Sequence, residues 1–497
     1  MLLPFAAAAL VASRTAQDAT HLLASDGGSS PLQPATDSSR PRLREVLPHR
    51  RLARAAEELS EAPADAQPGC VVARNFMNTQ YTVSIAVDGQ SFWAVPDTGS
   101  FELLVPSSNC SQCTACEGNA KTTFPETDVH ARSVRSHRVD IAFGQGNVVT
   151  RTVNAPVQVG GLSAPTQSLL LLEEINLSHY CDSSYDGVMG LGCRRNARDE
   201  DLEPSLLASM GIDDFSLCFG RYDADPGRLI LGGGILGLQY SHVPVVGQRH
   251  WAVQLVGAAF ASPSDAGRSG ERTRSLTGAL CATPPYCSAI VDSGTSLIAG
   301  PRQLVYALID ALHPQLEEDC SNVDQLPELE FAVGPPGASL PLRLSPEFYV
   351  LRTESTDADT DLPADPPAAP SAPPRQRCSL MFMELDMQDH TFGPVWILGA
   401  PFMRAYSTLF SRGEDGPTGG SVSPNPPAAA RQIGFARIPN ATNPCAGCPG
   451  SRGTSALAEA SARGEVAGPP SVSLRHARLS LLAKWGSRAA NTPAHIL

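Results

Sequence analysis

The chain has 497 residues, 42% of them apolar, which is enough to bury cores in two or three domains. Its net charge of −13 divides into −1 over residues 1–69, −16 over 70–444 and +4 over 445–497. The acidic central block excludes nucleic acid as the expected partner, and no apolar run reaches the roughly 18 residues of a transmembrane span.

The N-terminal residues differ from the rest of the chain. The longest apolar run, 2–12, ends in small residues and predicts a signal peptide over 1–16. Residues 17–69 lack strand alternation, and six arginines against one glutamate give a charge of +5 between Arg40 and Arg54. Because this basic segment precedes an acidic module, we expect the two to pair; a solvated linker is the alternative.

Cysteines and glycosylation motifs indicate the compartment. Thirteen cysteines are difficult to reconcile with a reducing cytosol, and N-glycosylation sequons lie in polar stretches at Asn109, Asn176 and Asn440. We therefore expect a protein of the secretory pathway, located outside the cell or in a vacuolar or lysosomal lumen.

From residue 81 onward the chain alternates short β-branched runs, such as YTVSIAV, VVTRTVNAPVQV and RLILGG, with Gly, Pro, Asn and Asp. This alternation of strand-forming runs with turn residues predicts an all-β fold. We expect one lobe over 70–240 and a second over 241–444. The proline-rich stretches 353–376 and 412–431 have too little apolar surface to offset chain ordering, so they are predicted to be exposed insertions, and 445–497 a mostly disordered tail.

Two segments share one motif. SFWAVPDTGS leads an apolar run into DTGS at 97–100, and SAIVDSGTSL leads another into DSGT at 292–295. Chance predicts about 0.2 such Asp-(Ser/Thr)-Gly triplets in a chain of this length. In each turn the glycine lets backbone N–H groups approach the carboxylate, and the hydroxyl residue can bond into the partner motif.

If a pseudo-two-fold axis relates the two copies, Asp97 and Asp292 face each other. Two carboxylates that share a site cannot both ionise readily, so the pair holds one proton over a broad pH range. Such a dyad can hold a water molecule, deprotonate it with one carboxylate and protonate a substrate carbonyl with the other. The motif thus predicts hydrolysis without a covalent intermediate.

Over about residues 73–438 the sequence resembles the pepsin family of aspartic proteases. The matching segments follow in the family's order: NFMNTQYTVSIAV, VDIAFGQG, YDGVMGLG, RLILGGG, CSAIVDSGTSLIAGP, LPELEFAV, WILGAPFMRAYSTLF and IGFARI. The resemblance implies a bilobal pepsin-like fold with a cleft between two β-rich lobes. It also implies a monomeric aspartic endopeptidase without a cofactor, which cleaves peptide or protein substrates and is made as a zymogen inhibited by its own prosegment, here 17–69.

The resemblance also implies the roles of individual residues. The catalytic pair would be Asp97 and Asp292. The remaining motif residues would support the pair, with Thr98 and Ser293 gripping each other beneath it and hydroxyls bonding the outer carboxylate oxygens. These supporting residues are Thr98, Gly99, Ser100, Ser293, Gly294 and Thr295.

The flap that covers the cleft in this family corresponds to Phe143, Gly144 and Gln145. The family usually has a tyrosine there, bonded to a tryptophan seven residues after the first aspartate. Here these positions are Phe143 and Leu104, so both partners of that bond are replaced together. Ala400 stands where many acid-active members carry an acid, which argues against a strongly acidic pH optimum.

Three disulfides follow from the resemblance. Cys281 with Cys287 and Cys320 with Cys378 match family pairs, and Cys110 with Cys116 resembles the small loop after the first motif. The other cysteines leave alternatives open. Cys181 and Cys193 can pair, Cys445 and Cys448 can tie the tail to a lobe or to each other, and a zinc site at Cys110, Cys113 and Cys116 is a further reading that lacks a fourth ligand. We expect no metal.

Other functions have less support. The histidines show no metal spacing, and no G-x-S-x-G motif accompanies them, so a serine hydrolase is excluded. Glycoside hydrolysis by two carboxylates gives no reason for two matching turns. A pepsin-fold protein that binds peptides without cleaving them is the main alternative, although such relatives typically lose a catalytic aspartate or its glycine.

Overall fold

A computed structural model describes most of the chain from Gly69 to Cys448. Its described residues are 69–116, 119–126, 135–143, 146–177, 180–193, 204–222, 225–261, 274–355, 375–413, 431–439, 443–446 and 448. The predicted signal peptide, nearly all of the predicted prosegment and the tail beyond Cys448 lie outside these residues.

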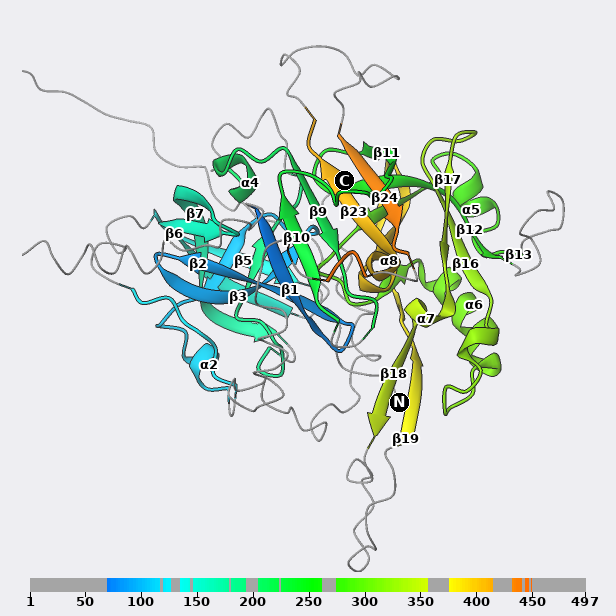
Figure 1. Ribbon diagram of the computed structural model, residues 1–497, viewed down its shortest axis with the longest axis horizontal. Coiled ribbons are helices and arrows are strands. Elements are labelled where there is room, and N and C mark those ends of the chain that lie inside the picture. The colour runs from blue at the N-terminus through cyan, green and yellow to red at the C-terminus, as the bar shows by residue number, and fades with distance from the viewer. Residues whose placement is uncertain are drawn as a thin grey trace, which may run out of the picture.

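The N-terminal lobe, blue to green in Figure 1, is built from strands and two short helices. Its apolar residues alternate where one face is buried, as in β2, and become nearly continuous where both faces are covered, as in β4 and β8. The elements are β2 (Gln80–Val87), β3 (Gln90–Asp97), β4 (Leu103–Pro106), α2 (Ser111–Thr114), β5 (Arg135–Phe143), β6 (Gly146–Val159), β7 (Leu162–Leu177), β8 (Gly187–Gly190) and α4 (Leu206–Ser209).

The C-terminal lobe lies on the other side of the molecule (Figure 1). Its longest helix, α6 (Arg302–Leu312), buries Val305, Leu308 and Leu312 at helical spacing. Its other principal elements are β12 (Ala252–Ala261), β13 (Arg274–Ser275), α5 (Ala279–Ala282), β14 (Cys287–Val291), β15 (Ile298–Gly300), β16 (Glu328–Val333), β17 (Leu340–Leu344), α7 (Pro346–Tyr349), β20 (Phe382–Glu384), β21 (Gln388–Asp389), β22 (Gly393–Leu398) and α8 (Ala400–Ala405).

A six-stranded antiparallel sheet connects the two lobes, in the order β1-β10-β9-β23-β24-β11. Three of its strands precede residue 240 and three follow it. They are β1 (Cys70–Phe76), β9 (Asp214–Cys218), β10 (Gly227–Leu231), β11 (Ser241–Val246), β23 (Tyr406–Ser411) and β24 (Gln432–Arg437).

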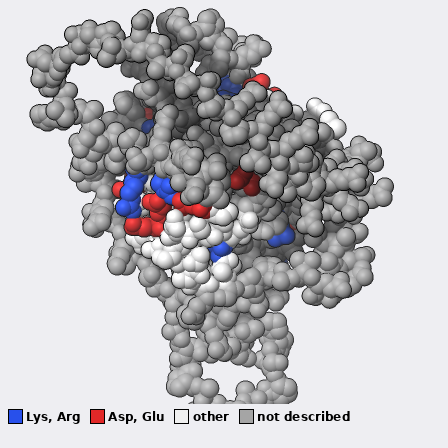
Figure 2. All heavy atoms as spheres, turned by 90° about the vertical axis from the view of Figure 1, so that its left-hand side faces the viewer, with Lys and Arg blue, Asp and Glu red and all other residues white. Residues whose placement is uncertain are grey.

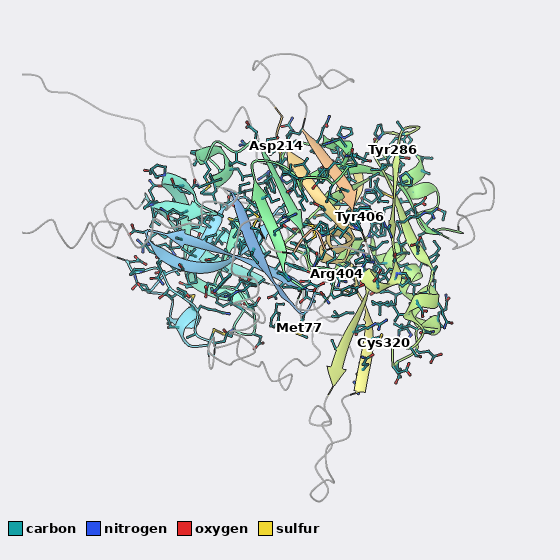
Figure 3. The ribbon with its side chains drawn as sticks, in the orientation of Figure 1. Met77, Asp214, Tyr286, Cys320, Arg404 and Tyr406 are labelled. Carbon is teal, nitrogen blue, oxygen red and sulfur yellow. A yellow bond between two sulfur atoms is a disulfide. The ribbon has the colours of Figure 1, made fainter. Side chains whose placement is uncertain are left out.

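Aromatic and charged side chains fix the join between the lobes. Phe215 stacks on Phe410 at 4.8 Å between ring centroids, and Trp251 meets both edge-on. Arg404, labelled near the centre of Figure 3, is buried and donates from Nη1 to the carbonyl of Arg221 in the first lobe at 3.4 Å, and from Nη2 to the carbonyl of Phe348 in its own lobe at 2.7 Å.

The strand pairing around the two motifs is duplicated. β3 pairs with β8 and β4 with β7, both in parallel, while β4 runs antiparallel to β8. In the second lobe β14 pairs with β22 and β15 with β20, again in parallel, while β15 runs antiparallel to β22. This repetition within a strand-dominated chain confirms the predicted all-β bilobal fold.

Twelve of the thirteen cysteines form disulfides, and the predicted pair Cys110–Cys116 is wrong. Cys110 pairs with Cys113, because the first turn of α2 brings these two residues to the same side at 5.3 Å between Cα atoms. Cys116 therefore pairs across the lobe with Cys181, which removes Cys181 as a partner for Cys193. The sulfur of Cys193 instead accepts a 3.2 Å hydrogen bond from Arg431 Nη1.

The structure contains the other two pairs implied by the resemblance, Cys281–Cys287 and Cys320–Cys378. The last two cysteines tie the C-terminal end of the described chain to the central sheet. Cys445 pairs with Cys218 on β9, and Cys448 pairs with Cys70 on β1. These two cysteines, which the predicted tail includes, therefore lie at the central sheet, and the rest of the tail stays a prediction.

The predicted insertion 353–376 lies only partly within the described residues. Its first and last residues belong to a two-stranded hairpin, β18 (Val350–Ser355) and β19 (Arg375–Leu380), which projects from the second lobe at the bottom of Figure 1. Cross-strand hydrogen bonds order these polar residues without a buried core. Residues 356–374 and 414–430 lie outside the described residues.

Acidic and basic side chains lie next to each other on one part of the outer face of the first lobe, as Figure 2 shows. Among the described residues, ion pairs join Arg138 on β5 to Glu173 and Glu174 on β7, and Arg151 on β6 to Glu173 and to Glu126, which precedes β5. Of the helices described, none has the length and apolar character needed to cross a membrane.

Candidate active site

The two motif loops lie at the ends of equivalent strands and bond in the same way. Asp97 ends β3, and Asp292 directly follows β14. The N–H of Gly99 donates to Asp97 Oδ1 at 2.9 Å, and that of Gly294 to Asp292 Oδ1 at 2.8 Å. In each loop the other carboxylate oxygen accepts a hydrogen bond from a hydroxyl group.

Ser100 Oγ donates to Asp97 Oδ2 at 2.5 Å, and Thr295 Oγ1 donates to Asp292 Oδ2 at 2.6 Å. Each carboxylate is thus held by one N–H and one O–H. Such bonds to an ionised oxygen are short and directional, so they fix the plane of each carboxylate.

Beneath the carboxylates, the second residues of the two motifs, Thr98 and Ser293, hydrogen-bond to each other, and we call this pair of bonds the grip. Thr98 N donates to Ser293 Oγ at 2.9 Å, and Ser293 N donates to Thr98 Oγ1 at 3.0 Å. The hydroxyls in turn donate to main-chain carbonyls of the opposite strands, Thr98 to Val291 at 2.7 Å and Ser293 to Pro96 at 2.5 Å. The grip is reciprocal, so it fixes the two loops relative to each other.

The motif glycines bring the two carboxylates together. A Cβ atom added to Gly99 would lie 2.7 Å from the carboxylate of Asp292, and one added to Gly294 would lie even closer to that of Asp97. No side chain fits at such separations. Only glycine fits at each of these positions, because the carboxyl group of the other motif occupies the space of a side chain. The two carboxyl groups therefore lie close together between the loops.

The electrostatics of the pair follow from its burial. Asp97 and Asp292 are 0% and 1% exposed. Burial raises the pKa of both carboxyl groups, and the charge of Asp292 raises that of Asp97 further, well above its usual range. The hydrogen bonds from Ser100 and Thr295 oppose these shifts. The pair therefore retains a shared proton to a higher pH than separate aspartates would.

An apolar pocket opens beside this pair. Asp97 and Gly294 form part of its lining, and the rest comes from the first lobe. The apolar side chains of the lining are Val95, Leu104, Phe143, Val148, Leu172, Leu177 and Val188, with Tyr180 and Tyr185 on a further side. Burial raises the pKa of Tyr185 to about 12, so its phenol is neutral at all physiological pH values.

The residues expected to form the flap lie at the end of the hairpin β5–β6. Phe143 is half-buried and shares the pocket with Asp97 and Leu104. Gly144 and Gln145 lie outside the described residues. The ring of Phe143 thus forms part of the pocket lining, and its role as a flap stays a prediction.

Ala400, the other expected departure, lies under the second motif. It is buried, and its N–H donates to the carbonyl of Thr295 at 2.8 Å. A methyl group offers the Thr295 hydroxyl no acceptor, so that hydroxyl donates only to Asp292.

The remaining predicted residues lie outside this constellation. Asn109 and Asn176 are exposed, as glycosylation requires, and Asn440 is not among the described residues. The zinc alternative is contradicted, because Cys110, Cys113 and Cys116 all form disulfides. No group of three or more metal-binding side chains occurs among the residues that the structure describes.

Two features of the site were not identified from the sequence. Tyr180 and Tyr185 line the pocket, and their only signal was a pair of aromatic residues just before GVMG. His250, 1% exposed, lies beside Phe101 at 5.0 Å between ring centroids and next to the first motif. Burial and the neighbouring Arg249 lower the pKa of His250 to about 4.

Comparison with known proteins agrees with this geometry. The sequence model of the eukaryotic aspartyl protease family matches residues 80–416. The chain is 27% identical to pepsin A of Sus scrofa over 364 residues, which cover 68% of this chain and 80% of the pepsin. It is 27% identical to renin of Canis lupus familiaris over 360 residues (69% and 79%) and 25% identical to plasmepsin VI of Plasmodium berghei over 356 residues (68% and 73%). With two reciprocal aspartate loops and a family match over most of its described length, the chain belongs to the eukaryotic aspartyl protease family.

Proposed function

We propose that the protein is an active aspartic endopeptidase in which Asp97 and Asp292 are the catalytic residues. The observation that carries this proposal is the completeness of both loops. Each carboxylate has its N–H donor, its hydroxyl donor and the glycine that admits the opposite carboxyl. A pepsin-fold protein that only binds peptides has no need of this arrangement.

The reaction follows from a shared proton. One carboxylate takes a proton from a water molecule held between the pair, while the other gives its proton to the carbonyl oxygen of the peptide bond. The resulting tetrahedral diol returns one proton to a carboxylate and accepts another at the amide nitrogen. The C–N bond then breaks, and the products are a carboxylic acid and an amine, with the dyad again singly protonated.

Substrates are peptides or proteins bound as an extended strand beneath the Phe143 hairpin. Main-chain hydrogen bonds would hold the strand, and alternate side chains would enter pockets. The apolar pocket beside Asp97 accepts a large apolar side chain, because its lining is almost entirely aliphatic or aromatic.

Activation and location belong to the same proposal. The basic segment between Arg40 and Arg54 would cover an acidic cleft until acid weakens the attraction, so that a new N-terminus appears near residues 60–72. Six disulfides support a secretory location. A precursor that is as active as the processed enzyme would contradict an inhibitory role for this segment.

The deciding experiment is cleavage of a peptide library by the purified protein from pH 3 to pH 8, with and without a statine-type analogue of the tetrahedral intermediate. Cleavage blocked by the analogue is expected. Binding of the analogue without any cleavage would favour the peptide-binding alternative, and neither binding nor cleavage would exclude both functions.

A further inference from the structure

One wall of the apolar pocket is a series of turns rather than a strand. We call Tyr180–Asp186 the pocket wall; it ends where β8 begins at Gly187. Its two tyrosines are 4% and 8% exposed and line the pocket. Its last residue continues the pairing with β3 through a 2.8 Å bond from the N–H of Asp186 to the carbonyl of Trp93, but the rest of the segment belongs to no strand, so its position depends on other contacts.

The principal contact comes from a buried lysine. The chain has only two lysines among 37 basic residues, and Lys121 is the one in the described part. It is 6% exposed, and its Nζ donates to the carbonyl of Ser183 at 2.7 Å and to Ser183 Oγ at 3.2 Å. The ammonium also lies 5.1 Å from the centre of the Tyr180 ring.

The ammonium group of Lys121 keeps its charge at acid and neutral pH. Burial lowers the pKa of Lys121 to about 8, although Asp186 and Asp182 oppose the shift, so the group is a cation at acid and neutral pH. A buried cation costs free energy unless it is paired and hydrogen-bonded. Here its partners are the oxygens of Ser183 and the face of Tyr180, both within the pocket wall.

Three neighbours of Lys121 reach the same wall. Cys116 is disulfide-bonded to Cys181. Asn119 Nδ2 donates to the carbonyls of Cys181 and Ser183 at 2.5 and 2.9 Å. The N–H of Thr122 donates to Asp186 Oδ1 at 2.9 Å. These contacts meet the wall at its second, fourth and seventh residues.

Bonds inside the wall connect these contacts to the tyrosines. Ser183 Oγ donates to the carbonyl of Tyr180 at 2.6 Å, and the Tyr180 hydroxyl donates to the carbonyl of Asp186 at 2.7 Å. Asp186 Oδ2 also accepts from the N–H of Trp93 on β3, four residues before Asp97. A shift of Ser183 therefore moves the aromatic rings that face the substrate pocket.

We propose that Cys116, Asn119, Lys121 and Thr122 are positioning residues that set the shape of this pocket and so decide which substrate side chain fits beside Asp97. Lys121 is the central member, because it holds the wall at Ser183 and contacts Tyr180 directly. With the wall in place, a large apolar side chain is preferred; with the wall released, that preference falls. This inference rests on the proposed peptidase function.

The test compares two peptides that differ only in the residue entering the pocket, leucine in one and alanine in the other. Lys121→Met keeps the length of the side chain but removes its charge and donors. We expect kcat/KM to fall about tenfold for the leucine peptide, mostly through KM, and less than about twofold for the alanine peptide. Asn119→Asp, at a half-buried position, should also lower kcat/KM for the leucine peptide more than for the alanine peptide, with a loss of about threefold on the leucine peptide.

The matched control is Arg228→Met, which removes a buried cation from β10, a strand that contributes nothing to the pocket lining. This variant should leave the ratio of kcat/KM for the leucine peptide to kcat/KM for the alanine peptide unchanged. Equal losses on both peptides, or a lower melting temperature without a change in the ratio, would assign Lys121 a purely structural role and overturn the proposal.

A second readout separates this inference from the proposed function. Binding of two statine-type peptides, with leucine or alanine at the same position, is measured by calorimetry and needs no turnover. If the protein binds both but cleaves nothing, the peptidase proposal fails. The selectivity ratio still decides the role of Lys121: a ratio that falls in Lys121→Met supports it, and an unchanged ratio overturns it.

Discussion

The two aspartate loops are nearly identical in their bonds, whereas the apolar clusters beside them differ. The cluster next to Asp97 has eleven buried members, among them two tyrosines and three cysteines. The cluster next to Asp292 has six, all aliphatic. The seventh residue after each aspartate shows the contrast, since it is Leu104 in the first lobe and Ala299 in the second.

This difference separates two requirements of the site. Sharing a proton needs two equivalent carboxylates, so the loops repeat each other. Selecting a side chain needs one shaped pocket, and only one lobe has to supply it. We therefore expect substitutions in the loops to act on turnover whichever lobe carries them, and substitutions around the pocket to act on selectivity from the first lobe alone.

The largest effect should follow from breaking the symmetry of the dyad. Asp97→Asn or Asp292→Asn leaves one ionisable group, so kcat should fall at least about a thousandfold in either variant. Peptide cleavage under single-turnover conditions measures this loss. Full activity in either variant would refute the shared-proton mechanism.

The same Asp97→Asn variant should be more stable than the parent at pH 7. The folded pKa of Asp97 lies above its ordinary 3.8, so the buried carboxyl costs stability once the pH rises past that value. The neutral amide avoids this cost, and urea unfolding at pH 7 would reveal the gain. A variant that lost both activity and stability would indicate damage to the loop instead.

The next effect concerns His250, which lies beside the first loop. Its folded pKa of about 4 is below the ordinary 6.5, so the unfolded chain takes up the proton first as the pH falls. Stability should therefore drop between pH 6.5 and pH 4, by up to about 3 kcal/mol. In His250→Gln this part of the pH dependence should vanish, while His242→Gln, on an exposed site of β11, should leave it unchanged.

The grip beneath the dyad offers a test of equivalence between the lobes. Thr98→Val and Ser293→Ala each remove a hydroxyl that accepts one N–H and donates to one carbonyl. Each should destabilise the fold by about 1–3 kcal/mol, measured by denaturant unfolding. A large loss in one variant and none in the other would show that the grip is not reciprocal.

The smallest effect is expected at Phe143. Phe143→Ala removes one side of the pocket and admits water to the dyad, so kcat/KM should fall about tenfold. Phe143→Tyr should remain within about twofold of the parent, because Leu104 offers the new hydroxyl no acceptor. A large gain for the tyrosine variant would mean that position 143 does not face the cleft.

Local patterns predicted much of this structure. The Asp-(Ser/Thr)-Gly turns can be recognised in the sequence because their chemistry restricts each position to one or two residue types. The runs that lead into them read as strands because both faces are buried. The pair Cys281–Cys287, by contrast, was implied by the family resemblance and not by a local pattern.

Contacts between distant segments could not be read in the same way. Whether Cys116 meets Cys110 or Cys181 depends on how α2 packs against the pocket wall, which no spacing encodes. The role of Lys121 had one sequence signal, the rarity of lysine, and its meaning needed the position of Ser183. Residues 353–355 and 375–376 are ordered by pairing between the two strands of the hairpin, and not by burial of apolar side chains.

The bond between Cys70 and Cys448 has a consequence for proteolytic nicking. It joins the first described strand to the last described residue across 378 positions, so any cut between them leaves both fragments covalently attached. The undescribed stretch 356–374 is also bracketed by Cys320–Cys378. A two-chain form cut there would migrate as one band on a non-reducing gel and as two after reduction. The disulfides would keep the later fragment, with β22, α8, β23 and β24, attached to the fragment that carries both Asp97 and Asp292.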